Sequence, residues 1–287
     1  DILDAEMQRV LDMGVEVRLN TKIEDLMTTM REGKFDASFL AVGAHIGRRA
    51  FIPSGEVSKI VDAVSVLRSM EGEDKPMLGR RVVVYGGGNT AIDVARTAKR
   101  LGAEETIIVY RRTREKMPAH DFEVEEALEE GVMMKWLSTI KSMDSGEITV
   151  EKMKLDEDGR PVGTGEFEKL EADSLVLARG QDVDLSLLDG VPGLEIKDGV
   201  GVGGKNMMTG HAGIFAGGDM VPSERTVTVG IGHGKKAARN IAAWLNGSEY
   251  VKPPKNEIAT FDKLNTWYYT DAPKTVRPTL DIIRRQT

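Results

Sequence analysis

The chain has 287 residues, 39 of them basic and 46 acidic, which gives a formal net charge of −7 at pH 7. About 40% of the residues are hydrophobic and none is cysteine. This composition predicts a folded protein without disulfides, thiol nucleophiles or thiolate-ligated metal centres in this sequence. An acidic chain with only short basic clusters is not expected to bind nucleic acid. No apolar run is long enough to predict a membrane span, and we expect a cytoplasmic protein.

The sequence starts inside a helical pattern. Apolar residues recur at helical spacing over residues 2–11, and Gly14 fits the position just after a helix. Residues 15–19 then alternate between apolar and polar, which predicts a strand. Because the chain has no initiator Met and no leading tail, we expect a piece of a longer protein; a processed mature protein is the alternative.

Two further predicted elements precede residue 80. Residues 35–44 are a short apolar run that ends in small residues, which predicts a buried strand entering a glycine turn. Residues 61–70 have the spacing of a short helix, and a polar linker follows over residues 71–79.

A β–α–β unit follows this linker. Residues 81–85 are a β-branched run typical of a buried parallel strand, and a glycine turn comes directly after it. Apolar residues at helical spacing over 91–101 predict a helix, and residues 106–110 predict a second buried strand. This order of elements predicts an α/β domain of the Rossmann type with a parallel sheet.

The second half of the chain mixes strand types. A helix is predicted over residues 121–130, and a buried strand over 173–178. Antiparallel strands are predicted between them, with a hairpin turn at Asp158-Gly159; they cover residues 133–140, 148–155 and 167–172. Later elements are a short strand from residue 213 into a glycine turn, a helix over 237–245, and an extended tail over 251–287. In that tail, Trp267-Tyr268-Tyr269 is expected to pack on the body of the protein; the alternative is that it faces a flavin or a partner.

The glycine turn carries the spacing of a dinucleotide-binding fingerprint. Gly86-x-Gly88-x-x-Ala91 provides a tight turn, room for a pyrophosphate near the backbone, and close packing of helix on strand. Asn89 and Thr90 open the helix, whose free N–H groups and dipole favour a phosphate. The alternative is a tight turn without a ligand.

The end of the second strand bears on the choice of coenzyme. An NAD site usually has an acidic residue about 20 residues after the glycines, bonded to the ribose. Here Arg111 and Arg112 stand at that point, and Arg114 follows. Guanidinium groups suit a 2′-phosphate, so the sequence favours NADP(H); a solvated basic loop is the alternative.

Several motifs together resemble the two-dinucleotide flavoprotein oxidoreductases. Within these, the chain is most similar to the glutamate synthase small subunit and to the NADPH-binding part of dihydropyrimidine dehydrogenase. The matching stretches lie in residues 82–93, 109–112, 117–119, 180–182 and 215–219. Gly213 to Asp219 resembles the late flavin motif of such proteins, and residues 39–44 resemble their earlier small-residue strand.

The resemblance implies a fold and a set of site residues. It implies an NADP-binding domain (46–180) nested within a partial FAD-binding domain (1–45 and 181–250), followed by an extended C-terminal segment (251–287). Beside the fingerprint and the arginines, the implied cofactor-binding residues are Gly180, Gln181, Gly218, Asp219, Thr226, Val227 and Thr228. The sequence departs from the family in lacking a first flavin glycine motif and a cysteine-rich segment, and Arg179 stands where relatives often have an apolar residue.

The function implied is that of an NADPH-dependent flavin oxidoreductase. In an intact parent protein, hydride would pass from NADPH to FAD and electrons would continue to an iron–sulfur domain or partner subunit, whereas this piece alone is expected to be inactive. We expect no catalytic side chain, because the cofactors carry this chemistry, and the spacing of the histidines predicts no metal site. The alternative is a non-catalytic nucleotide-binding subunit that docks a partner enzyme. A homodimer is a further expectation, since unpaired strand edges invite a second copy.

Overall fold

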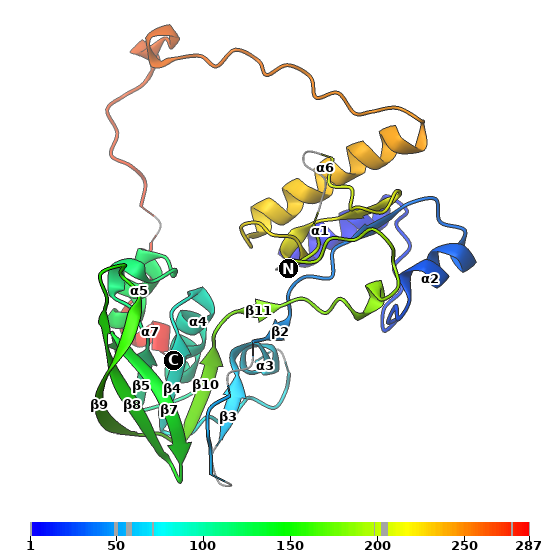
Figure 1. Ribbon diagram of the computed structural model, residues 1–287. Helices are drawn as coiled ribbons and strands as arrows, with labels where there is room; N and C mark the ends of the chain where they lie inside the picture. The colour runs from blue at the N-terminus through cyan, green and yellow to red at the C-terminus, as the bar shows by residue number, and fades with distance from the viewer. Residues whose placement is uncertain are drawn as a thin grey trace. The chain divides into compact units, whose positions relative to one another are not determined.

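The computed structural model describes two compact units of the chain. Unit 1 is formed by residues 1–43 and 183–251, and unit 2 by residues 44–182 and 252–287. Figure 1 labels helices and strands of both units. The described residues are 2–48, 51–55, 59–70, 72–197, 199–201, 206–276 and 278–286.

Unit 2 is built on a parallel five-stranded sheet with the strand order β3-β10-β4-β5-β6. The strands of this sheet are β3 (Ile60–Asp62), β4 (Arg81–Gly86), β5 (Glu105–Val109), β6 (Met133–Lys135) and β10 (Ser174–Ala178). Every residue of β10 is buried, and so are the four central residues of β4. Such apolar runs are typical of parallel strands that are covered on both faces, and the predicted α/β parallel sheet is confirmed.

Helices cover one face of this sheet. α4 (Asn89–Arg100) packs on β4 and β5, with α3 (Ala63–Ser69) and α5 (Asp121–Glu129) beside it. The buried positions of α4 are Ala91, Ile92, Val94, Ala95 and Ala98. They form one core with Val82, Val84 and Val176 of the sheet. The small side chains of α4 let the helix lie close to the strand that leads into it.

An antiparallel sheet of β7 (Ser138–Asp144), β8 (Glu147–Leu155) and β9 (Pro161–Glu171) supplies the apolar residues for the other face. Its residues Ile140, Ile148 and Val150 share a core with Val83 and Tyr85 of β4. The prediction of one strand over residues 133–140 was wrong. Leu137 has a φ of 47°, and this local break ends β6 in the parallel sheet and begins β7 in the antiparallel one.

The remaining elements of unit 2 are short. β2 (Ile46–Gly47) pairs antiparallel with β11 (Gln181–Asp182). One 3-10 turn, η1 (Arg114–Lys116), follows β5, and the tail contains η4 (Phe261–Lys263), η5 (Thr266–Tyr268) and α7 (Ile282–Gln286). Trp267 and Tyr268 stack on each other but are 72% exposed, and Tyr269 is 75% exposed. The prediction that these aromatic residues pack on the body was therefore wrong.

Unit 1 contains a two-stranded parallel sheet of β1 (Ser38–Leu40) and β12 (Ile214–Ala216). Its helices are α1 (Ile2–Asp12), α2 (Leu26–Gly33) and α6 (Val227–Leu245), with short turns η2 (Ser186–Leu188) and η3 (Gly218–Met220). Its core joins Ile214 and Ala216 to Leu40, Leu188 and Met220. The helix predicted over 237–245 extends back to Val227 because Thr226 caps its start, accepting a hydrogen bond from the Val229 N–H.

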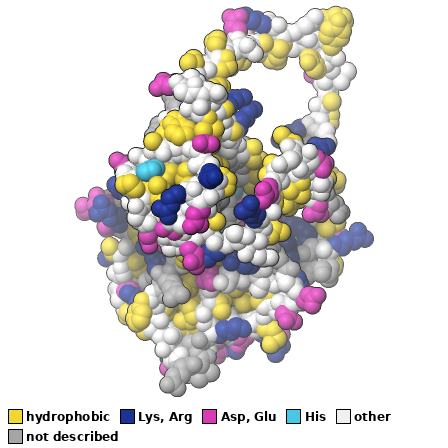
Figure 2. All heavy atoms as spheres, turned by 90° about the vertical axis from the view of Figure 1, so that its right-hand side faces the viewer, with side chains coloured by type: hydrophobic (Ala, Val, Ile, Leu, Met, Phe, Trp, Pro, Cys, Tyr) yellow, Lys and Arg dark blue, Asp and Glu magenta, His cyan; other side chains and the backbone are white. Residues whose placement is uncertain are grey.

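The strand predicted over residues 15–19 of unit 1 was wrong. These residues carry no strand pairing in the structure, and Val15, Val17 and Leu19 are at least half exposed. A segment with an alternating pattern forms a strand only when a neighbouring strand pairs with it. No strand in the described parts of the chain pairs with residues 15–19. No residue of α1 is buried either, and Figure 2 shows hydrophobic side chains at the surface between charged ones.

No helix in the described parts of the chain is long and apolar enough to cross a membrane.

A buried carboxylate ties helices α4, α5 and α7 of unit 2 together. Glu130 follows α5, its side chain is fully buried, and it accepts hydrogen bonds from Arg96 (2.6 Å) and Arg100 (3.1 Å) of α4. Arg285 of α7 pairs with neighbouring Glu129 at 2.9 Å and lies 3.8 Å from Glu130. Burial opposes ionisation of Glu130, but the hydrogen bonds and charges of Arg96 and Arg100 outweigh it and hold its pKa below the ordinary value.

Replacing this carboxylate should destabilise unit 2. Glu130→Gln removes the buried negative charge that Arg96 and Arg100 share, which leaves Arg96 with Glu126 as its remaining carboxylate partner and Arg100 without the Glu130 carboxylate. We therefore expect the free energy of unfolding to fall by at least about 2 kcal/mol in urea denaturation. Glu129→Gln is the matched control, because Glu129 is exposed and its pair should contribute less than about 1 kcal/mol. Equal losses in the two variants would show that the buried carboxylate contributes no more to stability than the exposed one.

The stabilisation by Glu130 should also depend on pH. Because the folded-state pKa is lowered, the contribution is complete above the unfolded-state pKa of about 4.3 and is lost as the pH falls through the folded value. The stability difference between the unmodified chain and Glu130→Gln should therefore shrink in acid. A difference that stays constant to the acid limit of folding would contradict this assignment.

Candidate nucleotide-binding site

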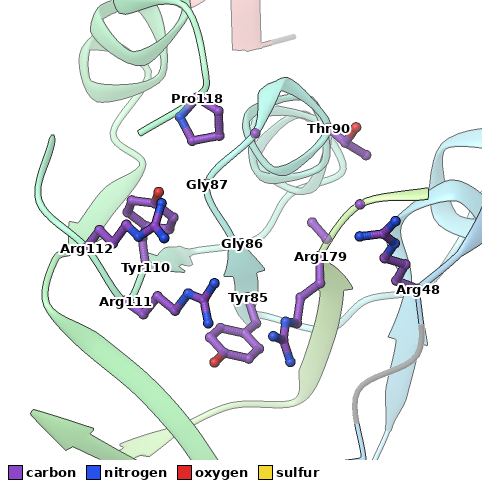
Figure 3. A pocket seen from close by; sticks show the side chains of 13 residues that line it. Arg48, Tyr85, Gly86, Gly87, Thr90, Tyr110, Arg111, Arg112, Pro118 and Arg179 are labelled. Atoms are coloured by element: carbon purple, nitrogen blue, oxygen red, sulfur yellow. The ribbon is translucent and has the colours of Figure 1, made fainter. Parts of the chain in front are cut away.

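A cavity of about 490 Å³ opens at the carboxyl ends of the parallel strands of unit 2. Figure 3 shows the glycine turn after β4 at its centre, with arginines on both sides. The lining residues are Arg48, Tyr85, Gly86, Gly87, Gly88, Thr90, Tyr110, Arg111, Arg112, Pro118, Ala178, Arg179 and Gly180. This is the edge of an open α/β sheet at which ligands characteristically bind.

The three glycines of the turn are required for different reasons. A Cβ at Gly86 would overlap the backbone carbonyl of Ala178 on β10, and one at Gly87 would overlap the Tyr110 ring. A Cβ at Gly88 would meet nothing within 4 Å, and its φ of −91° suits any residue. Gly86 and Gly87 are therefore needed for the fold itself, whereas Gly88 leaves open space that a ligand can fill.

Helix α4 begins at this open space. Its N-cap is Gly88, which has no side chain to accept the first N–H groups of the helix. Thr90 lines the cavity, whereas Ala91 is fully buried in the core and lets the helix pack closely. Asn89 accepts a hydrogen bond from the His120 N–H at 3.1 Å, so its side chain holds a loop and does not line the cavity.

That loop, residues 116–120, forms one wall of the site. The Ala119 N–H donates to the Gly87 carbonyl at 3.1 Å, and the Tyr110 hydroxyl donates to the Lys116 carbonyl at 2.7 Å. These bonds fix Pro118 against the glycine turn, where it lines the cavity. Residues 117–119 are among the stretches that resemble the family, but their place beside the glycine turn is not evident from the sequence.

The arginine pair predicted to select the coenzyme lies in the cavity. Arg111 and Arg112 follow β5 and both line it. The Nε atom of Arg112 is buried and has no hydrogen-bond partner in the described structure. The lining residues include no Asp or Glu among the described parts of the chain. Arg114 points elsewhere: it pairs with Glu125 at 3.3 Å and is not among the lining residues.

The opposite side of the cavity contains Arg48, Tyr85 and Arg179, which the sequence did not predict to bind a cofactor. Arg179 follows β10, and its guanidinium lies 5.4 Å from the centre of the Tyr85 ring. Arg48 pairs with Asp182 at 2.6 Å. Gly180 lines the cavity as predicted, whereas Gln181 enters β11 and does not.

The residues predicted to contact a flavin lie in unit 1. Gly218 and Asp219 form the short turn after β12, and Gly218 donates its N–H to His233 Nδ1 at 3.1 Å. Thr226 caps α6, and Val227 and Thr228 start that helix, with Val227 80% exposed. A role for these residues in flavin binding stays a prediction. Among the residues that the structure describes, no cluster of three or more His, Cys, Asp or Glu side chains could hold a metal ion.

Comparison with known proteins relates the chain to a family. The sequence profile of the pyridine nucleotide-disulphide oxidoreductases matches residues 2–237. The chain is 35% identical over 283 residues to the NADP(+)-dependent formate dehydrogenase subunit beta of Moorella thermoacetica, covering 93% of this chain and 39% of that protein. It is 31% identical over 268 residues to the glutamate synthase small chain of Escherichia coli K12, covering 81% and 56%. The resemblance to the glutamate synthase small subunit is thereby confirmed.

A solved structure supports the fold. Mycobacterium tuberculosis FprA in complex with NADPH aligns with a TM-score of 0.63 at 17% identity, covering 82% of this chain and 70% of that one. The chain spans about two fifths of the length of two of the curated relatives that it matches, 39% of one and 43% of the other.

The different roles of the glycines predict different effects on stability. Gly86→Ala forces apart β4 and β10, so the free energy of unfolding should fall by about 1–3 kcal/mol. Gly88→Ala places a methyl group in open space at an N-cap and should cost less than about 1 kcal/mol. Urea denaturation of both variants compares them directly, and an equal or larger loss for Gly88→Ala would contradict the assignment.

Proposed function

Because the chain belongs to the pyridine nucleotide-disulphide oxidoreductase family, we propose that unit 2 binds NADP(H) in the arginine-lined cavity. The observation that carries the proposal is the open backbone at Gly88 beside two arginines and no carboxylate among the described lining residues. The names of relatives that include NADPH agree with it.

The residues present fit a dinucleotide. The space above Gly88 suits the pyrophosphate, since the start of α4 presents N–H groups and the positive end of its dipole there. Pro118 and Thr90 line the same space. The site provides contact with the phosphates through backbone groups, which is why a larger side chain at Gly88 is expected to exclude the ligand.

The arginine pair selects the phosphorylated coenzyme in this proposal. Arg111 and Arg112 reach the cavity from the end of β5, where an NAD site has an acid bonded to the ribose. Arg111 and Arg112 line the cavity, and guanidinium groups can donate several hydrogen bonds to phosphate oxygens. A 2′-phosphate would compensate the charge of both guanidinium groups.

The activity of the whole protein is a further part of the proposal. When bound, NADPH and FAD supply the hydride chemistry, and the protein binds and orients them. We assign FAD to a site that includes Gly218, Asp219 and the start of α6, with electrons passing on to an iron–sulfur domain or partner subunit. Two relatives are named as subunits, one of a formate dehydrogenase and one of an NADPH-Fe(3+) oxidoreductase, which supports a partner subunit. A cytoplasmic location and a homodimer belong to the same proposal.

The coenzyme preference is directly testable. We expect NADPH to bind at least about tenfold more tightly than NADH, because two guanidinium contacts to a phosphate supply more than about 1.4 kcal/mol. Arg111→Ala combined with Arg112→Ala should remove the preference and retain NADH binding. Titration calorimetry measures both, and equal affinities of the unmodified chain for the two coenzymes would refute the arginine assignment.

The glycine turn gives an independent test. Gly88→Val fills the space proposed for the pyrophosphate, so NADPH binding should fall below detection while the circular dichroism spectrum stays unchanged. Arg160→Leu is a suitable control, because Arg160 is exposed in the hairpin between β8 and β9. Unchanged NADPH affinity in a folded Gly88→Val variant would mean that the turn is only structural.

A further inference from the structure

We propose that Arg179 binds the second phosphate of the dinucleotide, the one attached to the nicotinamide ribose. The inference rests on the proposed function, because it concerns the same cavity. It adds a binding residue on the side of the glycine turn opposite to Arg111 and Arg112 (Figure 3).

The strand order determines where the two halves of the ligand lie. β4 lies between β5 and β10, and Gly86 pairs with Ala178 at the edge where the cavity opens. With the pyrophosphate at the start of α4 and the 2′-phosphate at the end of β5, the other half of the dinucleotide must extend over the end of β10. Arg179 is the first residue after β10.

The guanidinium of Arg179 is oriented without being neutralised. It lies 5.4 Å from the centre of the Tyr85 ring, and the Tyr85 hydroxyl is fixed by a 2.6 Å hydrogen bond with Thr139. A cation–π contact orients the side chain but leaves its full charge and its N–H donors available. Among the described residues, Arg179 has no ion pair.

Arg48, the other arginine on this side, differs in this respect. Its Nε lies 2.6 Å from Asp182, so a carboxylate already compensates its charge. Arg179 is therefore the arginine on this side that has no carboxylate partner among the described residues, and its guanidinium can bind an anionic group of the ligand. Of the groups in the second half of the dinucleotide, only the phosphate is anionic, which favours it over the carboxamide and the ribose hydroxyls.

Three ligands with different chemical groups can show which part of the dinucleotide Arg179 contacts. Adenosine 2′,5′-bisphosphate has the 2′-phosphate but lacks the second phosphate of the pyrophosphate. 2′-Phospho-ADP-ribose has that phosphate but no nicotinamide, and NADP⁺ has both. Their affinities are to be measured by titration calorimetry for the unmodified chain, Arg179→Leu, Arg179→Lys and the control Arg160→Leu, with circular dichroism as the check of folding.

The proposal predicts a specific pattern. Arg179→Leu should weaken NADP⁺ and 2′-phospho-ADP-ribose by about tenfold, and the bisphosphate by less than about twofold. Arg179→Lys should recover part of the loss because it keeps the charge, and the control should match the unmodified chain.

Other patterns overturn the proposal. Unchanged affinity for NADP⁺ would mean that Arg179 does not contact the ligand, and a loss for NADP⁺ alone would place the contact at the nicotinamide. An equal loss for all three ligands would place it at the 2′-phosphate side. If the unmodified chain binds none of the three, the proposed function itself fails, whereas normal binding of the bisphosphate with no effect of Arg179→Leu overturns only the role of Arg179.

Discussion

The close approach of β4 and β10 at the end of the parallel sheet is the constraint on which the site depends. A side chain at Gly86 would overlap the Ala178 carbonyl, so only glycine lets the two strands stay paired to their last residues. The chain then turns at once into α4, whose N-cap has no side chain. The start of the helix is left open to the cavity, and its N–H groups are available to a phosphate.

The arginines around the glycine turn after β4 explain why the cavity suits a ligand with several separate negative charges. Arg111 and Arg112 lie on one side and Arg179 on the other, and no acidic residue is among the described residues that line the cavity. Arg48 also lines the cavity, but Asp182 compensates its charge. Arg114 pairs with Glu125 outside the cavity. A dinucleotide with a 2′-phosphate presents negative charge on both sides of its adenosine ribose, which matches this distribution.

The β–α–β unit and the turn could be predicted because their signals are local: a β-branched run, glycines at fixed spacing and a helix period all lie within about 30 residues. Features set by tertiary contacts could not. Residues 15–19 alternate like a strand but have no pairing partner in the described structure, and Leu137 divides one apparent strand between two sheets. Arg114 shares the basic cluster yet pairs with Glu125, whereas Arg179 reaches the cavity only because β10 lies beside β4.

A crystal structure of the chain with NADP⁺ tests the central claim most directly. The account predicts the pyrophosphate at the N-terminus of α4 above Gly88 and the 2′-phosphate within hydrogen-bond distance of Arg111 or Arg112. A nucleotide bound away from the glycine turn, or with its 2′-phosphate turned into solvent, would contradict it.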